Sequence, residues 1–305
     1  MIQEPEARLV AELETMIFQE RCGGCGSALE PPVAVEGAAN RLRPDAFFAS
    51  SSHKLSSSLV TCESCGLTQV GALLDPSDLQ VAYADATDDD HSKQFDHRRS
   101  SFERALQRSV FPYTSADERS PWLDVGTAGG AFVAAARGLD IEATGIEPSV
   151  YVVSQAPSEV RPYLRSGFID DLDPSERFQV ISYWDVLEHV ADPRAEILTA
   201  KKHLAPGGFL VLNLPMIDTV SARLLGRRWP FYLDVHLYYF TRDTIDRFLT
   251  PLGFEVIAMK SYSQTLDLRY LLARYMRGRS PVALLSRIPI RYWMGQRTVV
   301  ARLVT

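Results

Sequence analysis

Pro121-Trp122-Leu123-Asp124-Val125-Gly126-Thr127-Ala128-Gly129-Gly130-Ala131-Phe132 is the stretch that decides the fold of this chain. It joins a short apolar run with an acid near its end to a glycine-rich turn and an alanine-rich segment. This order predicts a strand, a loop and a helix, a unit that can hold a cofactor with several polar groups. A glycine-rich loop alone does not specify the cofactor, so the surrounding segments must decide which one binds.

After this loop, apolar runs alternate with helical segments, which predicts an α/β sheet. Glu147 lies at the tip of the second expected strand, about 20 residues past Gly126, where an acid can accept hydrogen bonds from both ribose hydroxyls of an adenosine. The expected strands are 122–125, 143–146, 178–184, 209–213, 254–259 and 297–304, with an edge segment before Gly167. The expected helices are 130–137, 150–155, 193–203, 268–276 and 282–286.

All four cysteines lie in two pairs, Cys22-Gly23-Gly24-Cys25-Gly26 and Cys62-Glu63-Ser64-Cys65-Gly66. Each CxxCG can form a tight turn, because the final glycine accepts a backbone conformation that other residues avoid. Two such turns supply four thiolates, which matches a closed tetrahedral zinc site of structural type. Free buried thiols and a redox pair are the alternatives, and His53 between the pairs is expected to be an exposed loop residue.

A polar bridge separates the cysteine pairs from the sheet. Asp75-Pro76 breaks the chain, and apolar residues then recur at helical spacing between Lys93 and Phe111. This amphipathic helix could lie over the cofactor mouth as a lid or pack on the sheet as a connector. Tyr83, His91 and His97 are candidate contacts with the site.

The charge of the chain is uneven. The net charge is −6, yet residues 260–305 carry nine Lys or Arg and one acid, Asp267. An acidic body argues against nucleic acid as a partner. The basic tail favours a phosphate-bearing substrate or an anionic membrane surface, with a solvated face as the alternative. The start of the sequence lacks the pattern of a signal peptide and no apolar run is long enough to span a membrane, so we expect a cytoplasmic protein.

Four motifs in order resemble those of class I S-adenosylmethionine-dependent methyltransferases. They are Leu123-Asp124-Val125-Gly126, Gly145-Ile146-Glu147-Pro148, Asp185-Val186-Leu187-Glu188-His189-Val190 with Asp192-Pro193, and Leu204-Ala205-Pro206-Gly207-Gly208. The block from His236-Leu237-Tyr238-Tyr239-Phe240-Thr241 to Leu252-Gly253-Phe254 resembles one branch of that family. The twin cysteine pairs resemble the zinc-bearing branch that includes sugar C-methyltransferases.

The resemblance covers residues 119–260 and implies a Rossmann-like seven-stranded methyltransferase sheet. The implied organisation is a zinc-ribbon module at 1–75, a helical linker or lid at 76–118, and a cofactor-binding domain at 119–305 with a basic helical insertion at 261–296. The family's usual Cys-Gly is replaced by Thr127-Ala128, which adds a methyl group near the amino-acid end of the cofactor. The implied S-adenosylmethionine contacts are Asp124, Gly126, Thr127, Gly130, Glu147, Pro148, Phe168, Ile169, Trp184 and Asp185.

Two histidines are candidates for the general base of methyl transfer. His189 follows the strand at 178–184, and His236 lies in the later block; each could instead have a purely structural role. Asp185, Glu188 and His189 also resemble the metal-binding residues of ubiquinone O-methyltransferases, so a second divalent ion is a further hypothesis.

The resemblance predicts methyl transfer to a small-molecule acceptor, for which a nucleotide-linked sugar, a glycan or a natural-product intermediate is favoured. Whether carbon, oxygen or nitrogen accepts the methyl group is left open, as is the oligomeric state. One alternative is a catalytically degenerate fold whose zinc ribbon recruits a partner. Another is a nicotinamide-dependent dehydrogenase, although the Glu188-His189-Val190 segment and the Pro206-Gly207-Gly208 turn have no place in that class.

Overall fold

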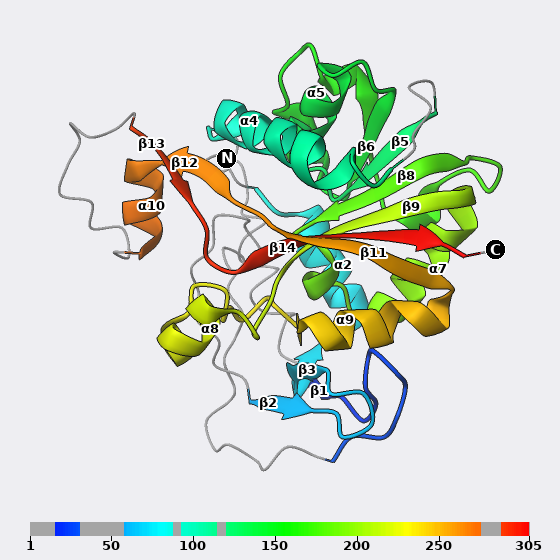
Figure 1. Ribbon diagram of the computed structural model, residues 1–305, viewed down its shortest axis with the longest axis vertical. Coiled ribbons are helices and arrows are strands. Elements are labelled where there is room, and N and C mark those ends of the chain that lie inside the picture. The colour runs from blue at the N-terminus through cyan, green and yellow to red at the C-terminus, as the bar shows by residue number, and fades with distance from the viewer. Residues whose placement is uncertain (1–15, 31–57, 88–92, 115–119, 276–287, 305) are drawn as a thin grey trace, which may run out of the picture.

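The computed structural model describes residues 16–30, 58–87, 93–114, 120–275 and 288–304. Its centre is a seven-stranded sheet of order β11-β14-β9-β8-β5-β6-β7 (Figure 1). β14 runs antiparallel to β11 and β9, and the other neighbouring strands of the sheet pair in parallel. The Rossmann-like methyltransferase sheet is therefore confirmed. The strands are β5 (Trp122–Val125), β6 (Ala143–Glu147), β7 (Leu164–Ser166), β8 (Phe178–Trp184), β9 (Leu204–Pro215), β11 (Phe254–Ser261) and β14 (Gln296–Leu303).

Helices cover both faces of this sheet. Figure 1 shows α4 (Phe95–Ala105) and α5 (Ala131–Arg137) on one side, with α7 (Pro193–His203) and α9 (Arg242–Leu249) on the other. The central strands β5 and β8 are consequently buried along almost their whole length. Other helical elements include α6 (Val150–Ser154), α8 (Val220–Leu225) and the short turns at 106–110, 161–163, 169–171, 187–189, 226–228 and 250–252.

The helix expected between Lys93 and Phe111 is a connector packed on the sheet. It forms α4 and a further turn at 106–110, and Phe102 on its inner face contacts the rings of Phe132 and Trp184. No residue of α4 lines the cofactor-sized cavity described below. The packing of this helix matches the connector alternative.

A shorter helix before it, α2 (Pro76–Ala84), was not expected from the sequence. The Asp75 side chain accepts a hydrogen bond from the Ser77 N–H at 2.9 Å and so caps the helix, and Pro76 occupies its first turn. The break at Asp75-Pro76 is therefore the start of a helix.

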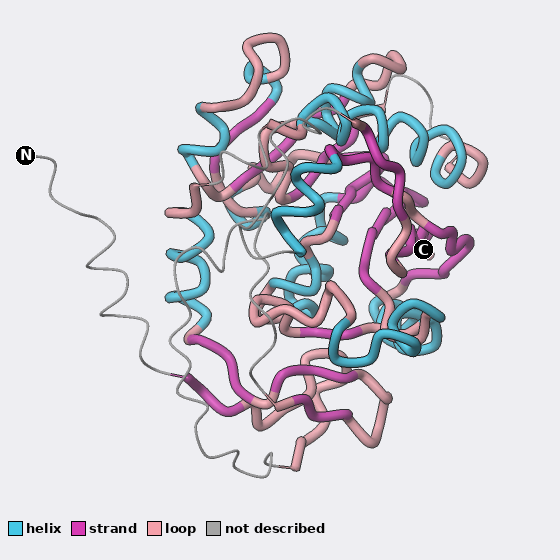
Figure 2. Tube along the Cα trace, turned by 90° about the vertical axis from the view of Figure 1, so that its left-hand side faces the viewer, coloured by secondary structure: helices cyan, strands magenta, loops and turns pink. Residues whose placement is uncertain are grey.

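The cysteine-bearing module joins the rest of the fold through main-chain pairing. β2 (Leu59–Thr61) and β3 (Thr68–Val70) form a sheet with β10 (Tyr238–Tyr239), which belongs to the His-Leu-Tyr-Tyr-Phe block. A second pair joins β1 (Met16–Phe18) to β4 (Ala72–Leu74). Figure 2 shows these strands together at one end of the molecule. The module and the methyltransferase sheet also share one hydrophobic core, which includes Cys22, Cys62 and Leu67.

The basic C-terminal segment folds as a hairpin and a helix against α4. It contains β12 (Gln264–Asp267), α10 (Leu268–Tyr275) and β13 (Pro289–Tyr292). The expected helix at 282–286, together with Arg277 and Arg279, lies outside the described residues, as do His53 and His91. No helix in the described ranges is long and apolar enough to cross a membrane.

Candidate functional site

A cavity of about 330 Å³ lies at the carboxyl ends of β5, β6 and β8. Ligands of open α/β sheets bind at this edge, and the volume falls within the range of small-molecule sites. The loops after β5, β6, β7 and β8 all contribute to its wall. Seven of the residues expected at the site line it: Gly126, Glu147, Pro148, Phe168, Ile169, Asp185 and His189.

The glycine-rich loop needs glycine at both of its ends. Gly126 has φ +67°, and a Cβ there would lie 2.7 Å from a methyl group of Val186. Gly130 has φ +79° and caps α5, and its Cβ would lie 2.9 Å from Leu164. A side chain at either position would therefore meet both backbone strain and a steric clash.

Glu147 presents a carboxylate at the tip of β6 whose position is fixed by main-chain donors. The Ala128 N–H donates to Oε2 at 2.9 Å, and the Ser149 N–H donates to Oε1 at 3.2 Å. Burial raises the pKa of Glu147, and the two backbone hydrogen bonds oppose that shift. Ala128, the departure from the family's loop, has φ +49° and lines the cavity while supplying one of these donors.

Asp124 lies within the sheet and is absent from the described cavity lining. It is 3% exposed, and the Ser182 hydroxyl on the neighbouring strand donates to Oδ1 at 2.7 Å. Burial raises the pKa of Asp124 to about 7, against the lowering effect of its hydrogen bonds. The lining also omits Thr127, Gly130 and Trp184.

Trp184 lies in an aromatic cluster on the α4 side of the sheet. Its ring centroid is 5.1 Å from that of Phe102 and 5.5 Å from that of Tyr262. The indole N–H has no hydrogen-bond partner within the described part of the chain.

Asp185 is held by three side-chain amides that the sequence did not point to. The Asn213 amide donates to Oδ1 at 2.8 Å, the Gln296 amide donates to both oxygens at 2.7 Å, and the Gln264 amide donates to Oδ2 at 3.3 Å. Asp185 also has φ +58°, an uncommon conformation for a residue with a side chain. Strands β9, β12 and β14 thus combine to orient one carboxylate at the cavity wall.

His189 lines the cavity through the loop after β8. Its Nδ1 lies 2.9 Å from the Tyr83 hydroxyl and 3.0 Å from the Val235 carbonyl oxygen. Burial lowers the pKa of His189 to about 4, although the Val235 carbonyl favours the charged form. The imidazole is therefore neutral near pH 7.

His236 lies behind His189, outside the residues that line the cavity. It is 4% exposed, and its ring centroid is 4.7 Å from that of His189. Both carboxylate oxygens of Glu188 are buried nearby without a hydrogen-bond partner among the described residues. Burial and then the charge of Asp185 raise the pKa of Glu188.

The ligand atoms of Glu188, His189 and His236 lie within 4.8 Å of one another. A second divalent ion was hypothesised at Asp185, Glu188 and His189. The set that the fold gathers contains His236 in place of Asp185, whose carboxylate is held by amides.

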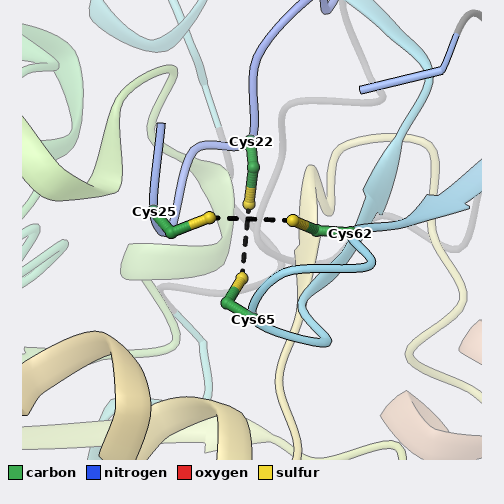
Figure 3. Close-up of side chains that lie close together, drawn as sticks. All are labelled: Cys22, Cys25, Cys62 and Cys65. Carbon is green, nitrogen blue, oxygen red and sulfur yellow. Dashed lines mark hydrogen bonds between the residues drawn. The ribbon is translucent and has the colours of Figure 1, made fainter. Parts of the chain in front are cut away.

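The four cysteines converge as a metal site requires. Figure 3 shows their side chains pointing toward one another, with Sγ–Sγ distances of 3.5 Å for Cys22 and Cys65 and 3.6 Å for Cys25 and Cys62. Zinc bound to four thiolates at about 2.3 Å would separate the sulfurs by about 3.8 Å, so the arrangement fits that ion. Gly26 and Gly66 have φ +74° and +80°, and each N–H donates to the carbonyl of the first cysteine at 2.8 Å. The two turns thus have the conformation expected from CxxCG.

One wall of the cavity comes from the start of the segment 76–118, which was expected to be a helical linker or lid. Tyr83, a candidate contact from the sequence, lines the cavity. Leu79, Gln80, Tyr83 and Ala86, in and just after α2, all line it. Of the histidines in the bridge, His97 does not line the cavity, and its Nε2 lies 3.2 Å from Oδ1 of Asp267. The capping pair Asp75-Pro76 was the signal for this helix, but no local pattern indicated what it covers.

Comparisons with known proteins agree with this geometry. A family model described as a methyltransferase domain matches residues 93–259. The mitochondrial ubiquinone biosynthesis O-methyltransferase of Candida albicans is 32% identical over 110 residues, covering 32% of this chain and 33% of the relative. The ubiquinone biosynthesis O-methyltransferase of Azorhizobium caulinodans is 29% identical over 141 residues, covering 44% of this chain and 54% of the relative. The chain therefore spans between a third and about half of the length of these curated relatives.

Among solved structures, similarity extends to a chain of the complex that contains the Haloferax volcanii Trm112 methyltransferase activator. The TM-score is 0.51 at 16% identity, over 74% of this chain and 98% of that chain. At this identity the likeness bears on the fold alone.

Proposed function

This chain belongs to the methyltransferase-domain family, and we propose on that premise that it transfers the methyl group of S-adenosylmethionine to a small-molecule acceptor. The observation that carries the proposal is the Glu147 carboxylate, fixed by two N–H donors at the cavity wall. A carboxylate at the end of the second strand of such a sheet can accept both ribose hydroxyls.

Residues in the cavity wall and next to it fit the other parts of this cofactor. Gly126 and Gly130 would let the backbone approach the amino-acid end, and Asp124 would act on the ammonium group by charge. Phe168 and Ile169 would flank the adenine from the loop after β7. Trp184 and Asp185, at the end of β8, are assigned to the region of the sulfonium. When bound, the cofactor would supply the methyl group on that sulfonium for transfer.

The acceptor side is proposed to include His189. Methyl transfer depends on placing the acceptor in line with the methyl group, and an acceptor hydroxyl must also lose a proton. A neutral imidazole at the cavity wall can receive that proton, whereas His236 is buried behind it. A nucleotide-linked sugar or a related glycan intermediate remains our proposed acceptor class, supported by the basic C-terminal segment and the twin cysteine pairs.

The cysteine module is proposed to hold one structural zinc ion. Four thiolates complete a tetrahedral shell and leave no position for substrate, so the ion would not take part in catalysis. The module at 1–75, the bridge at 76–118 and the domain at 119–305 remain our proposed organisation, with the module and the domain sharing a core.

Calorimetric titration of the purified protein with S-adenosylmethionine and, separately, with NADH tests the cofactor assignment. We expect saturable binding of S-adenosylmethionine alone. Binding of NADH alone would favour the dehydrogenase alternative and overturn the proposal.

Transfer of a radiolabelled methyl group to a panel of nucleotide sugars tests the activity. We expect label in at least one of them. Tight cofactor binding without transfer to any acceptor would favour the degenerate fold whose zinc ribbon serves as an interaction module.

A further inference from the structure

The cavity is closed on one side by α2, which lies outside the matched methyltransferase region at 93–259. Leu79 and Ala82 are buried and fix the helix on the fold, while Gln80 and Tyr83 reach the cavity. Because this segment comes from the bridge after the cysteine module, the matched domain alone does not complete the site.

Two contacts tie this segment to opposite sides of the cavity. The Tyr83 hydroxyl contacts Nδ1 of His189, which follows β8. Three residues later, the Ala86 carbonyl accepts a hydrogen bond from the Ser149 hydroxyl at 2.8 Å, and Ser149 follows β6. β5 pairs with both of these strands, so the segment spans the strand end that carries the glycine-rich loop.

We propose that Tyr83 is a positioning residue that, together with the Val235 carbonyl, fixes the orientation and tautomer of His189 at the cavity wall. The assignment deepens the proposed function, on which its consequence for methyl transfer rests. The tautomer of the His189 ring, which the proposal assigns, can be measured without any methyl acceptor.

The positions of the hydrogen atoms follow from the partners of Nδ1. The Val235 carbonyl can only accept, and it lies 3.0 Å from Nδ1, so Nδ1 must carry the proton. The Tyr83 oxygen, at 2.9 Å, then accepts a second, bifurcated hydrogen bond from the same N–H. Were the hydroxyl to donate instead, Nδ1 would be unprotonated and would face the carbonyl oxygen with its lone pair.

The consequence for chemistry is a neutral imidazole whose lone pair is on Nε2. The ring is also held between two edge-on aromatic contacts, with Tyr83 at 5.9 Å and 78° and with His236 at 4.7 Å and 86°. The carboxylate of Glu188 also lies within 4.8 Å of a nitrogen of this ring. A fixed Nε2 lone pair is what a group that receives a proton from an acceptor hydroxyl requires.

The test uses the full-length protein with ¹⁵N-labelled histidine. Long-range ¹⁵N–¹H spectra distinguish the two tautomers of each neutral imidazole, and His189→Gln identifies the signals of His189. In the wild type we expect the proton on Nδ1. In Tyr83→Phe one of the two acceptors of that N–H is lost, so the ratio of the Nε2–H to the Nδ1–H tautomer should rise about fivefold, the factor for one neutral hydrogen bond.

Tyr183→Phe is the matched control. Tyr183 is a buried tyrosine whose hydroxyl donates to Glu196, another residue of the cavity wall, at 3.0 Å. Its removal should leave the His189 signals unchanged. An unchanged tautomer ratio in Tyr83→Phe, or an Nε2–H tautomer in the wild type, would overturn the proposal; the second measurement applies even if the variant does not fold.

Cofactor binding separates this proposal from the proposed function. If the wild type fails to bind the cofactor, the proposed function fails. The assignment of the Nδ1–H tautomer to His189 can still hold in that case. If the cofactor binds and the tautomer ratio does not respond to Tyr83→Phe, only the role of Tyr83 fails.

Discussion

Single residues at this site are fixed by partners that lie far away in sequence. Glu147 depends on the N–H of Ala128, and Asp124 on the hydroxyl of Ser182. In the proposed function, Glu147 would bind the ribose hydroxyls and Asp124 would act on the ammonium group. The strength of these pairs can therefore be tested one residue at a time.

Glu147→Ala should weaken S-adenosylmethionine binding at least 100-fold. Two charge-assisted hydrogen bonds at about 1.5–3 kcal/mol each account for a loss of that size. Calorimetric titration measures it, with Glu142→Ala, an exposed acid just before the same strand, as the control. Retained affinity in Glu147→Ala would refute the ribose contact.

Binding of S-adenosylmethionine should release a proton from Asp124 between pH 6 and pH 7. The pKa of Asp124 in the free protein is about 7, so the acid is largely protonated there, and a nearby ammonium group would lower that pKa. The binding constant should then rise with pH, by at most about tenfold per unit, until Asp124 is ionised in the free protein. Calorimetry in buffers of different ionisation enthalpy detects the proton, and Asp124→Asn should abolish the release.

The same raised pKa predicts how the stability of the free protein depends on pH. Between the ordinary aspartate pKa near 4 and the folded pKa near 7, the folded state binds more protons than the unfolded state. The contribution of Asp124 to stability is therefore fully present at low pH and is lost as pH rises through that window. Urea titrations from pH 5 to pH 8 should show Asp124→Asn losing less stability than the wild type; an equal loss would contradict the assignment.

At the scale of elements, the cysteine module is linked to the wall of the cavity by successive main-chain hydrogen bonds. The Val70 N–H on β3 donates to the Leu237 carbonyl at 2.9 Å, and the Leu237 N–H donates to the Glu188 carbonyl at 2.7 Å. The first cysteine turn also packs closely against β10, since a Cβ at Gly23 would lie 2.5 Å from the Tyr238 ring. The module thus supports the segments that carry His189 and His236.

Cys62→Ser should remove one zinc ion per chain and weaken S-adenosylmethionine binding. Structural zinc contributes on the order of 10 kcal/mol to folding a small module, and the cavity wall depends on that module through Leu237. Metal analysis by mass spectrometry and calorimetry measure the two effects. Ser64→Ala, within the same turn, is the control. Unchanged zinc content in Cys62→Ser would rule out the four-thiolate site.

At the scale of the molecule, the shared core predicts one cooperative unit. Cys22, Cys62 and Leu67 belong to the same cluster of buried residues as Leu212 of the central sheet and Phe248 of α9. Residues of a single core lose their packing together, so the module cannot melt without exposing the sheet beneath it.

Removal of zinc with a strong chelator should lower the melting temperature of the whole chain by about 10 °C or more, in a single transition. Differential scanning calorimetry with and without the chelator measures this. Two separate transitions, with the upper one unmoved, would show that the module folds apart from the methyltransferase domain.

The sequence by itself determined the elements whose signals are local. β5, β8 and α7 have the bounds expected from the sequence, because strand burial and helix capping, here by Asp192, are set by neighbouring residues. The glycines at 126 and 130 and the acid at 147 were likewise predictable, since close approach and the strand tip are encoded in the motif. The two CxxCG pairs likewise predicted that the four cysteine side chains come together.

Only the tertiary structure decided which residues close the site. It placed α2 over the cavity, set Gln264 and Gln296 on Asp185, and buried His236 behind His189. It also packed α4 against Trp184 of the sheet and joined the cysteine module to β10. The physical reason is that side-chain hydrogen bonds and packing join residues far apart in the sequence, such as Gln296 and Asp185, which are 111 positions apart, and no local pattern records such partners.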